Sequence, residues 1–213
     1  MKITVKNATK IIKDAVILKD VQIELESGKV YGLQGPNGGG KTMLMRLISG
    51  LIRPTRGSVY IDDKQLGKDI DFPPSIGVLI ENPAFLPNYT GLQNLELLAR
   101  IQARADQAQI RQTISDVGLQ PNDKRKYRKY SLGMKQRLGI AAAVMEQPDL
   151  IILDEPTNAL DEEGVERICQ IIRRERDRGA LIIMACHDAR ILESVSDMIY
   201  TVVDGYVERK AVS

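Results

Sequence analysis

A glycine-rich segment with one lysine and one threonine occupies residues 35–42 (GPNGGGKT), between an apolar stretch and an amphipathic one. Glycines let backbone N–H groups come close to phosphate oxygens, and they accept the positive φ that such loops use. Lys41 could reach the β and γ phosphates of a nucleotide, and Thr42 could offer its hydroxyl to Mg²⁺. Because chance produces this pattern in only about one per cent of chains this long, we favour a phosphate-binding loop over a glycine-rich turn. The predicted nucleotide-binding residues of this loop are Gly35, Pro36, Asn37, Gly38, Gly39, Gly40, Lys41 and Thr42.

Two adjacent carboxylates, Asp154 and Glu155, follow the apolar run Leu150–Leu153. Such a run is typical of a buried parallel strand, and open α/β sheets place their ligand sites at the carboxyl ends of strands. Asp154 could then hold Mg²⁺ and its water shell, and Glu155 could polarise the water that attacks a γ phosphate. The alternative is a solvated acidic turn before Pro156, and the apolar run ahead of the pair favours the catalytic interpretation.

His187 is the only histidine of the chain and follows a second apolar run, Ala180–Ala185. A single histidine is more often structural or merely exposed than functional. Here, however, a strand at Ala180–Ala185 would end at the sheet edge that already carries the phosphate loop and the acidic pair. We therefore predict a catalytic role for His187, together with Glu155 and Lys41.

A strand, a loop and a helix are needed to hold the phosphate-binding segment. Residues 29–34 (KVYGLQ) have the composition of a strand. Residues 41–50 (KTMLMRLISG) have apolar residues at helical spacing and end in Gly50, with Pro54 shortly after, which is typical of a helix end. The order of these segments is the one that a phosphate-binding loop requires.

The remaining segments predict a mixed α/β architecture. Further strands are expected in residues 2–30 and 57–65. Residues 88–147 have helical composition with breaks at Gly91, Gly118 and Pro121. Residues 166–179 (ERICQIIRRERDRG) predict an amphipathic helix that covers the sheet.

Composition and charge exclude several classes of protein. The 213 residues are 43% hydrophobic and 27% charged, which suits a globular protein with a sizeable core. The 30 basic and 28 acidic residues give a net charge of +2, so no nucleic-acid partner is expected, and the basic segment 124–129 (KRKYRK) is interpreted as a solvated loop. The two cysteines are too few for a disulfide framework and favour a reducing cytoplasm. No apolar run reaches the roughly 20 residues of a spanning helix, and residues 1–10 lack the apolar core of a signal peptide.

The motifs, and the order in which they occur along the chain, resemble those of the ATP-binding subunits of ABC transporters over nearly the whole chain. The phosphate loop resembles the Walker A motif, residues 150–156 (LIILDEP) the Walker B motif with its catalytic glutamate, and His187 the switch histidine. Residues 158–161 (NALD) resemble the D-loop, which ends at Asp161. Residues 130–138 (YSLGMKQRL) resemble the family signature, and also the signatures of the bacitracin and lantibiotic resistance exporters. The signature residues that would face the nucleotide of a partner subunit are Ser131, Gly133 and Met134.

The resemblance implies a fold. The expected fold class is α/β: a RecA-like P-loop NTPase core with an amino-terminal antiparallel β subdomain and an inserted helical subdomain. Residues 1–213 would form a single ABC ATPase domain, with the core and β subdomain in 1–87 and 148–213 and the helical subdomain with the signature in 88–147.

The resemblance also implies an activity and partners. The expected activity is ATP hydrolysis with ATP and Mg²⁺ as cofactors, and the expected metal ligands are Thr42, Glu81 and Asp154. ATP would join two chains head to tail, as a homodimer or with a related subunit. A separate transmembrane permease, an exporter of antimicrobial peptide, drug or lipid, would hold the dimer on the cytoplasmic face of the membrane. The alternative is an ABC-type ATPase with a soluble macromolecular partner; the long coiled coil of the DNA-repair relatives is missing between the Walker motifs.

Three positions depart from the usual family pattern. Leu132 replaces a signature glycine; it either restricts the backbone or packs against a neighbour, and we favour packing. Glu81 stands where the family usually has a glutamine that touches Mg²⁺ and responds to the membrane partner; a carboxylate can also ligate Mg²⁺, and the alternative is a surface or capping glutamate. Ile12 corresponds to a position that often carries an adenine-stacking aromatic ring. Its replacement predicts weak ATP binding and poor discrimination against GTP.

Overall fold

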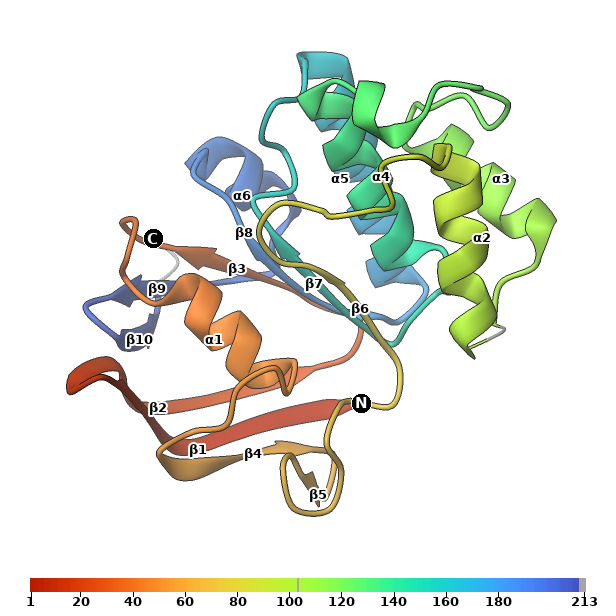
Figure 1. Cartoon of the computed structure of the whole chain (residues 1–213). Coiled ribbons are helices and arrows are strands. Elements are labelled where there is room, and N and C mark those ends of the chain that lie inside the picture. The colour runs from red at the N-terminus through yellow and green to blue at the C-terminus, as the bar shows by residue number, and fades with distance from the viewer. Residues whose placement is uncertain (103, 211–213) are drawn as a thin grey trace.

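The structure is a computed structural model, and it describes residues 1–102 and 104–210. The strands form one six-stranded sheet, in the order β10-β9-β3-β8-β7-β6, and one four-stranded sheet, in the order β2-β1-β4-β5 (Figure 1). The strands are β1 (Lys2–Ile12), β2 (Ala15–Glu26), β3 (Val30–Gln34), β4 (Arg56–Ile61), β5 (Lys64–Gln65), β6 (Ile76–Leu79), β7 (Leu150–Asp154), β8 (Leu181–Ala185), β9 (Met198–Val203) and β10 (Tyr206–Arg209).

The six-stranded sheet is parallel except for β10, which runs antiparallel to β9. Its register brings three strand ends together, because Ala185 of β8 is paired with Leu33 of β3 on one side and with Asp154 of β7 on the other. The segments that follow these strands carry the phosphate loop, the acidic pair and His187. All three therefore start from the same edge of one sheet, as expected.

Both faces of the six-stranded sheet are covered, which explains its continuous apolar runs. In β7, Ile151 and Leu153 belong to a core shared with the helices, whereas Leu150 and Ile152 belong to a core shared with α1 and the antiparallel sheet. All four side chains are at most 1% exposed. The antiparallel sheet buries one face only, since buried and exposed residues alternate along residues 21–26 of β2.

Helices cover both faces of the six-stranded sheet, and α1 lies on the side of the antiparallel sheet (Figure 1). The helices α2, α3 and α4 occur between β6 and β7 in sequence; α2 and α3 lie at one side of the molecule, whereas α4 packs against β6 (Figure 1). The helices are α1 (Lys41–Ile48), α2 (Gly91–Gln102), α3 (Gln107–Asp116), the short 3₁₀ helix η1 (Tyr127–Lys129), α4 (Leu132–Val144), α5 (Glu162–Asp177) and α6 (Ala189–Val195).

Local sequence explains where the helices begin and end. Gly50 follows α1 with a φ of 81°, and Gly118 follows α3 with a φ of 79°, so both accept the left-handed backbone that ends a helix. Gly91 is the first residue of α2 and thus marks a helix start. The long helix α5 buries Ile168, Ile171 and Ile172 on one face, as the amphipathic pattern predicts.

The predicted fold class is confirmed: an α/β core with an antiparallel β part and an inserted group of helices. Within residues 1–102 and 104–210, no helix is long and apolar enough to cross a membrane.

Candidate active site

A cavity of about 670 Å³ opens at the carboxyl edge of the six-stranded sheet. It brings together groups that are far apart in sequence, from the phosphate loop, from the acidic pair after β7 and from the segment after β8. The predicted site residues that line it are Pro36, Asn37, Gly38, Gly40, Lys41, Thr42, Glu81, Asp154, Glu155 and His187. Six predicted residues are not part of its lining: Gly35, Gly39, Ser131, Gly133, Met134 and Asp161.

The phosphate loop curls around the side chain of Lys41. This lysine is only 7% exposed, and its Nζ donates to the carbonyl oxygens of Gly35 (2.7 Å) and Pro36 (3.0 Å). The helix α1 starts at Lys41, and no side chain caps its first backbone N–H groups. Uncapped N–H groups at a helix start attract anions, so this end of α1 suits a phosphate group.

Two glycines of the loop are required by packing against β9 rather than by the ligand. A Cβ on Gly35 would overlap the carbonyl oxygen of Val202, and a Cβ on Gly39 would lie 2.6 Å from that same oxygen. The carbonyl oxygen of Gly39 also accepts a hydrogen bond from the N–H of Gly205, just after β9 (3.0 Å). These contacts hold the phosphate loop against the sheet.

Thr42 and Asp154 meet in the cavity, where the Thr42 hydroxyl donates to Oδ2 of Asp154 at 2.6 Å. A hydroxyl and a carboxylate are oxygen donors of the kind that Mg²⁺ prefers, so this pair fits the metal of a nucleotide. Among the residues described, no group of three or more His, Cys, Asp or Glu side chains is placed to hold a metal ion. A site with few protein ligands is typical of Mg²⁺ that is bound together with phosphates. Glu81, the third predicted ligand, lines the cavity but pairs with Arg46.

Glu155 and His187 form a second pair in the same cavity. The N–H of Glu155 donates to the carbonyl oxygen of Ala185 (3.0 Å), which continues the pairing of β7 with β8 and brings the two residues together. The backbone N–H of His187 donates to Oε2 of Glu155 (3.1 Å), and the imidazole Nε2 lies 3.2 Å from Oε1.

Burial shapes the acid–base chemistry of Glu155. It raises the pKa of the Glu155 carboxyl above its ordinary value, and the negative charge of Asp154 acts in the same direction. The hydrogen bond from the His187 backbone, the His187 side chain and Lys41 act in the opposite direction and lower that pKa. A carboxylate with a raised pKa is a stronger base, which suits proton abstraction from water.

The signature segment begins α4; Leu132 and Gln136 of this segment line the cavity, whereas Ser131, Gly133 and Met134 do not. Oγ of Ser131 accepts from the N–H of Met134 (3.2 Å), so Ser131 is the N-cap of α4. A Cβ on Gly133 would come 2.6 Å from the carbonyl oxygen of Ala159, which explains the glycine there. Leu132 is 63% exposed, so the prediction that it packs against a neighbour is wrong within the chain. Its φ is not positive, since it lies in the first turn of α4.

Asp161 joins the start of α5 to α4. Its Oδ1 accepts from the N–H of Gly164 (3.1 Å) and from Nη2 of Arg137 (2.7 Å). The D-loop aspartate therefore caps one helix and anchors it to the helix that carries the signature.

Several lining residues were not among the predicted site residues, and Gln136 and Ile17 are two of them. Gln136 of α4 is 7% exposed, and its Nε2 donates to the carbonyl oxygen of Glu155 (2.8 Å). The sequence did contain a signal for Gln136, since it is a polar residue one turn into a mostly apolar helix. Ile17 of β2 lines the cavity, whereas Ile12, the residue matched to a position that often carries an adenine-stacking ring, is not part of the lining.

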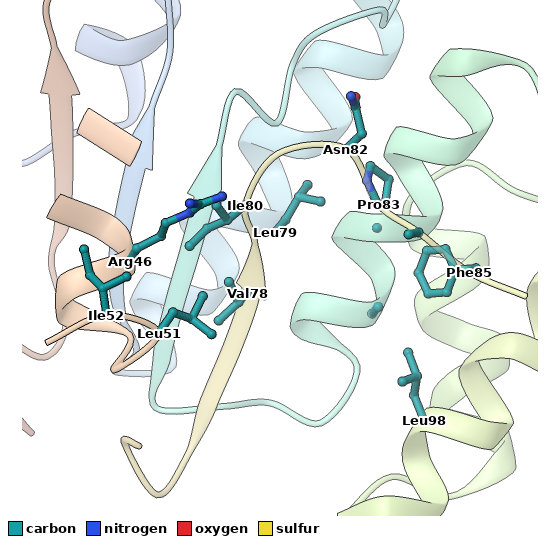
Figure 2. Close-up of a pocket in the computed structure, with 13 residues that line it drawn as sticks. Arg46, Leu51, Ile52, Val78, Leu79, Ile80, Asn82, Pro83, Phe85 and Leu98 are labelled. Carbon is teal, nitrogen blue, oxygen red and sulfur yellow. The ribbon is translucent and has the colours of Figure 1, made fainter. Parts of the chain in front are cut away.

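A second hollow, which we call the lateral groove, has a volume of about 520 Å³ and lies between α1, β6 and the helices α2 and α4 (Figure 2). Figure 2 shows Phe85 and Leu98 on one side of it and Leu51 and Ile52 on the other. Arg46 is the one charged residue among those that line the groove in the described part of the chain.

The fold and the cavity together define a P-loop nucleotide hydrolase, with a glycine-rich loop, a hydroxyl–carboxylate pair and a half-buried carboxylate at one sheet edge. Comparison with known proteins narrows this class. Residues 18–158 match a family model described as ABC transporter. An ABC transporter ATP-binding protein of Bacillus subtilis, YybJ, is 47% identical over 97% of this chain and 94% of its own length.

Relatives with named transport substrates are more distant. The bacitracin transport ATP-binding protein BcrA of Enterococcus faecalis is 35% identical and is matched over 96% of this chain and 67% of its own length. The lantibiotic transport ATP-binding protein SrtF of Streptococcus pyogenes is 34% identical, over 95% and 87% respectively. A solved dimeric structure of a bacterial ABC transporter cassette has a TM-score of 0.88 and 28% identity, with 97% of both chains covered. The chain therefore belongs to the ABC transporter family, as an ATP-binding subunit with ATPase activity.

Proposed function

We propose that this chain is the motor subunit of an exporter: it hydrolyses ATP as a dimer and drives a separate membrane permease that moves an antimicrobial peptide, a drug or a lipid. The observation that carries the proposal is the incomplete site. Phosphate loop, acidic pair and His187 share one cavity, whereas Ser131, Gly133 and Met134 lie outside it at the start of α4. The likeness to proteins named for bacitracin and lantibiotic transport supports an export role.

In the proposed reaction, backbone N–H groups of residues 35–42 bind the phosphates of ATP, and Lys41 exchanges its carbonyl partners for phosphate oxygens. Thr42 and Asp154 would hold Mg²⁺, which when bound offsets negative charge on the phosphates. Glu155 takes a proton from the water that attacks the γ phosphorus, while the bond from that phosphorus to the bridging oxygen breaks and ADP and inorganic phosphate leave. The N–H of His187 orients the Glu155 carboxylate toward that water, and its imidazole faces the same carboxylate.

The second chain supplies the missing wall. In a head-to-tail dimer, the start of α4 in one chain would face the cavity of the other, so that Ser131 and its neighbours bind the γ phosphate there. A helix start attracts anions, which is the property that the phosphate loop also uses. Two-fold symmetry would give two equivalent composite sites, and a related subunit could replace the second copy.

The permease would bind at the lateral groove. Its apolar lining and its position beside residues 81–82, which line the active-site cavity, suit a membrane partner that must sense the nucleotide. Docking there would hold the ATPase on the cytoplasmic face of the membrane. The partner segment is expected to be apolar, because it would replace water against Leu51 and Leu98.

Affinity purification from gently solubilised native membranes tests this proposal. A multi-span membrane protein should be recovered in near-equal amount with the tagged wild-type chain. Leu98→Asp, inside the groove, should lose it, while Ile101→Asp, which is exposed on the same helix outside the groove, should retain it. Recovery of ribosomal, DNA-bound or other soluble partners in its place would contradict a transport role while leaving the ATPase chemistry intact.

A further inference from the structure

One ion pair stands in the wall between the active-site cavity and the lateral groove. Nη2 of Arg46 lies 2.7 Å from Oε1 of Glu81. Arg46 lines the groove and Glu81 lines the cavity, while Asn82 lines both. Figure 2 shows Arg46 reaching from α1 toward Ile80, the residue before Glu81. The pair therefore connects the helix of the phosphate loop to the segment that follows β6.

The geometry of both partners is constrained by their elements. Arg46 lies four residues after Thr42 in α1, so the two side chains share one helix face, with Thr42 in the cavity and Arg46 one turn further along. Glu81 has a φ of 61°, a left-handed conformation that is uncommon for a residue with a side chain. This backbone turn directs Glu81 to the wall where Arg46 can reach its carboxylate.

The charges near this wall make the pairing consequential. The cavity already contains the carboxylates of Asp154 and Glu155 together with the ammonium group of Lys41. A further unpaired carboxylate at Glu81 would repel the phosphates of ATP, because like charges repel each other even in a partly solvated site. Paired with Arg46, the wall carries no net charge.

We propose that Arg46 is a positioning residue for Glu81: the ion pair neutralises the carboxylate and holds it at the wall, away from Thr42 and Asp154. This inference rests on the proposed nucleotide site, but it adds a residue to which that proposal gives no role. It explains how a glutamate can occupy the wall of an anion-binding cavity. Without Arg46, the carboxylate would repel metal-free ATP, whereas Mg²⁺ would screen that repulsion.

The test is equilibrium binding of a fluorescent ATP analogue, measured with excess EDTA and again with Mg²⁺. Arg46→Gln is expected to weaken metal-free binding by about three- to tenfold and Mg²⁺-supported binding less, and high salt should reduce the difference. Arg46→Lys should retain wild-type binding. The double variant Arg46→Gln with Glu81→Gln should return to within about twofold of wild type, because the unpaired charge is gone.

Three results would overturn the inference: no change in Arg46→Gln, a double variant that binds as weakly as Arg46→Gln, or a Glu81→Gln variant that itself binds metal-free ATP more weakly than wild type. The second result would show that Arg46 acts by packing. Because Glu81→Gln removes only a charge on a side chain that is 62% exposed, it remains informative if Arg46→Gln folds poorly. The role as a transporter motor is tested separately by recovery of the permease, which these titrations do not involve.

Discussion

Replacing Glu155 with glutamine removes the carboxylate that accepts a proton but keeps the size and shape of the side chain. Glutamine has nearly the same volume and keeps a side-chain oxygen that can accept from the N–H of His187, as Oε2 of Glu155 does. The other oxygen, Oε1, makes no hydrogen bond although it lies 3.2 Å from Nε2 of His187. Replacing Oε1 with the NH₂ group of glutamine therefore breaks no hydrogen bond. Since the substitution also removes a buried charge, the thermal midpoint should stay the same or rise.

The expected loss lies in the chemical step. Removing a positioned general base costs about 10²- to 10⁴-fold in rate, or about 3–5 kcal/mol of transition-state free energy. ATP affinity should be preserved, because Glu155 is not among the groups that bind phosphate. We therefore expect Glu155→Gln to bind ATP normally, to hydrolyse it at least about a hundredfold more slowly in single-turnover assays, and to elute as a dimer in gel filtration only when ATP is present.

Glu162→Gln is the matched control, since Glu162 is exposed in the first turn of α5. Its hydrolysis rate should equal that of the wild type. A Glu155→Gln variant with a rate within about threefold of wild type would refute the assignment of Glu155 as the base, because general-base contributions are far larger. A variant that stays monomeric with ATP at high concentration would contradict the composite site.

Two further predictions concern His187 and the phosphate loop. Glu155 must be ionised to act as a base, so kcat should fall as the pH drops through the raised pKa of Glu155. The His187 side chain lowers that pKa. His187→Gln should therefore move the loss of activity to higher pH in a profile of kcat against pH. A profile that moves to lower pH would contradict this reasoning. Both Gly35 and Gly38 have a positive φ, of 152° and 77°, but only a Cβ on Gly35 would overlap the carbonyl oxygen of Val202. In thermal unfolding, Gly35→Ala should therefore cost about 3 kcal/mol or more, whereas Gly38→Ala, with open space around it, should cost about 1–2 kcal/mol. Equal losses in the two variants would refute the packing argument.

Local sequence determined the chemistry of the site. A run such as Leu150–Leu153 predicts a strand buried on both faces, and the residue after such a strand lies at the ligand edge of a parallel sheet. The loop at residues 35–42 likewise predicts its own backbone, because glycine and helix-start signals act over a few residues. These short-range rules were sufficient to place Asp154, Glu155 and His187 at one edge.

Tertiary structure decided which of these groups touch. The Glu155–His187 pair depends on β7 lying next to β8, and the Thr42–Asp154 hydrogen bond joins residues 112 positions apart. Likewise, Gly35 is required by Val202, on a strand that is remote in sequence. None of these contacts has a local signature, because each depends on the order in which distant strands pair.

The expectation that Leu132 packs against a neighbour failed within the chain for the same physical reason. Whether an apolar side chain is covered depends on which elements approach it in space, and sequence periodicity describes only its own helix or strand. The Arg46–Glu81 pair also depends on which elements approach each other in space. Its residue types could be read from the sequence, but only the packing of α1 against the segment after β6 brought the two charges to 2.7 Å and placed them between two cavities.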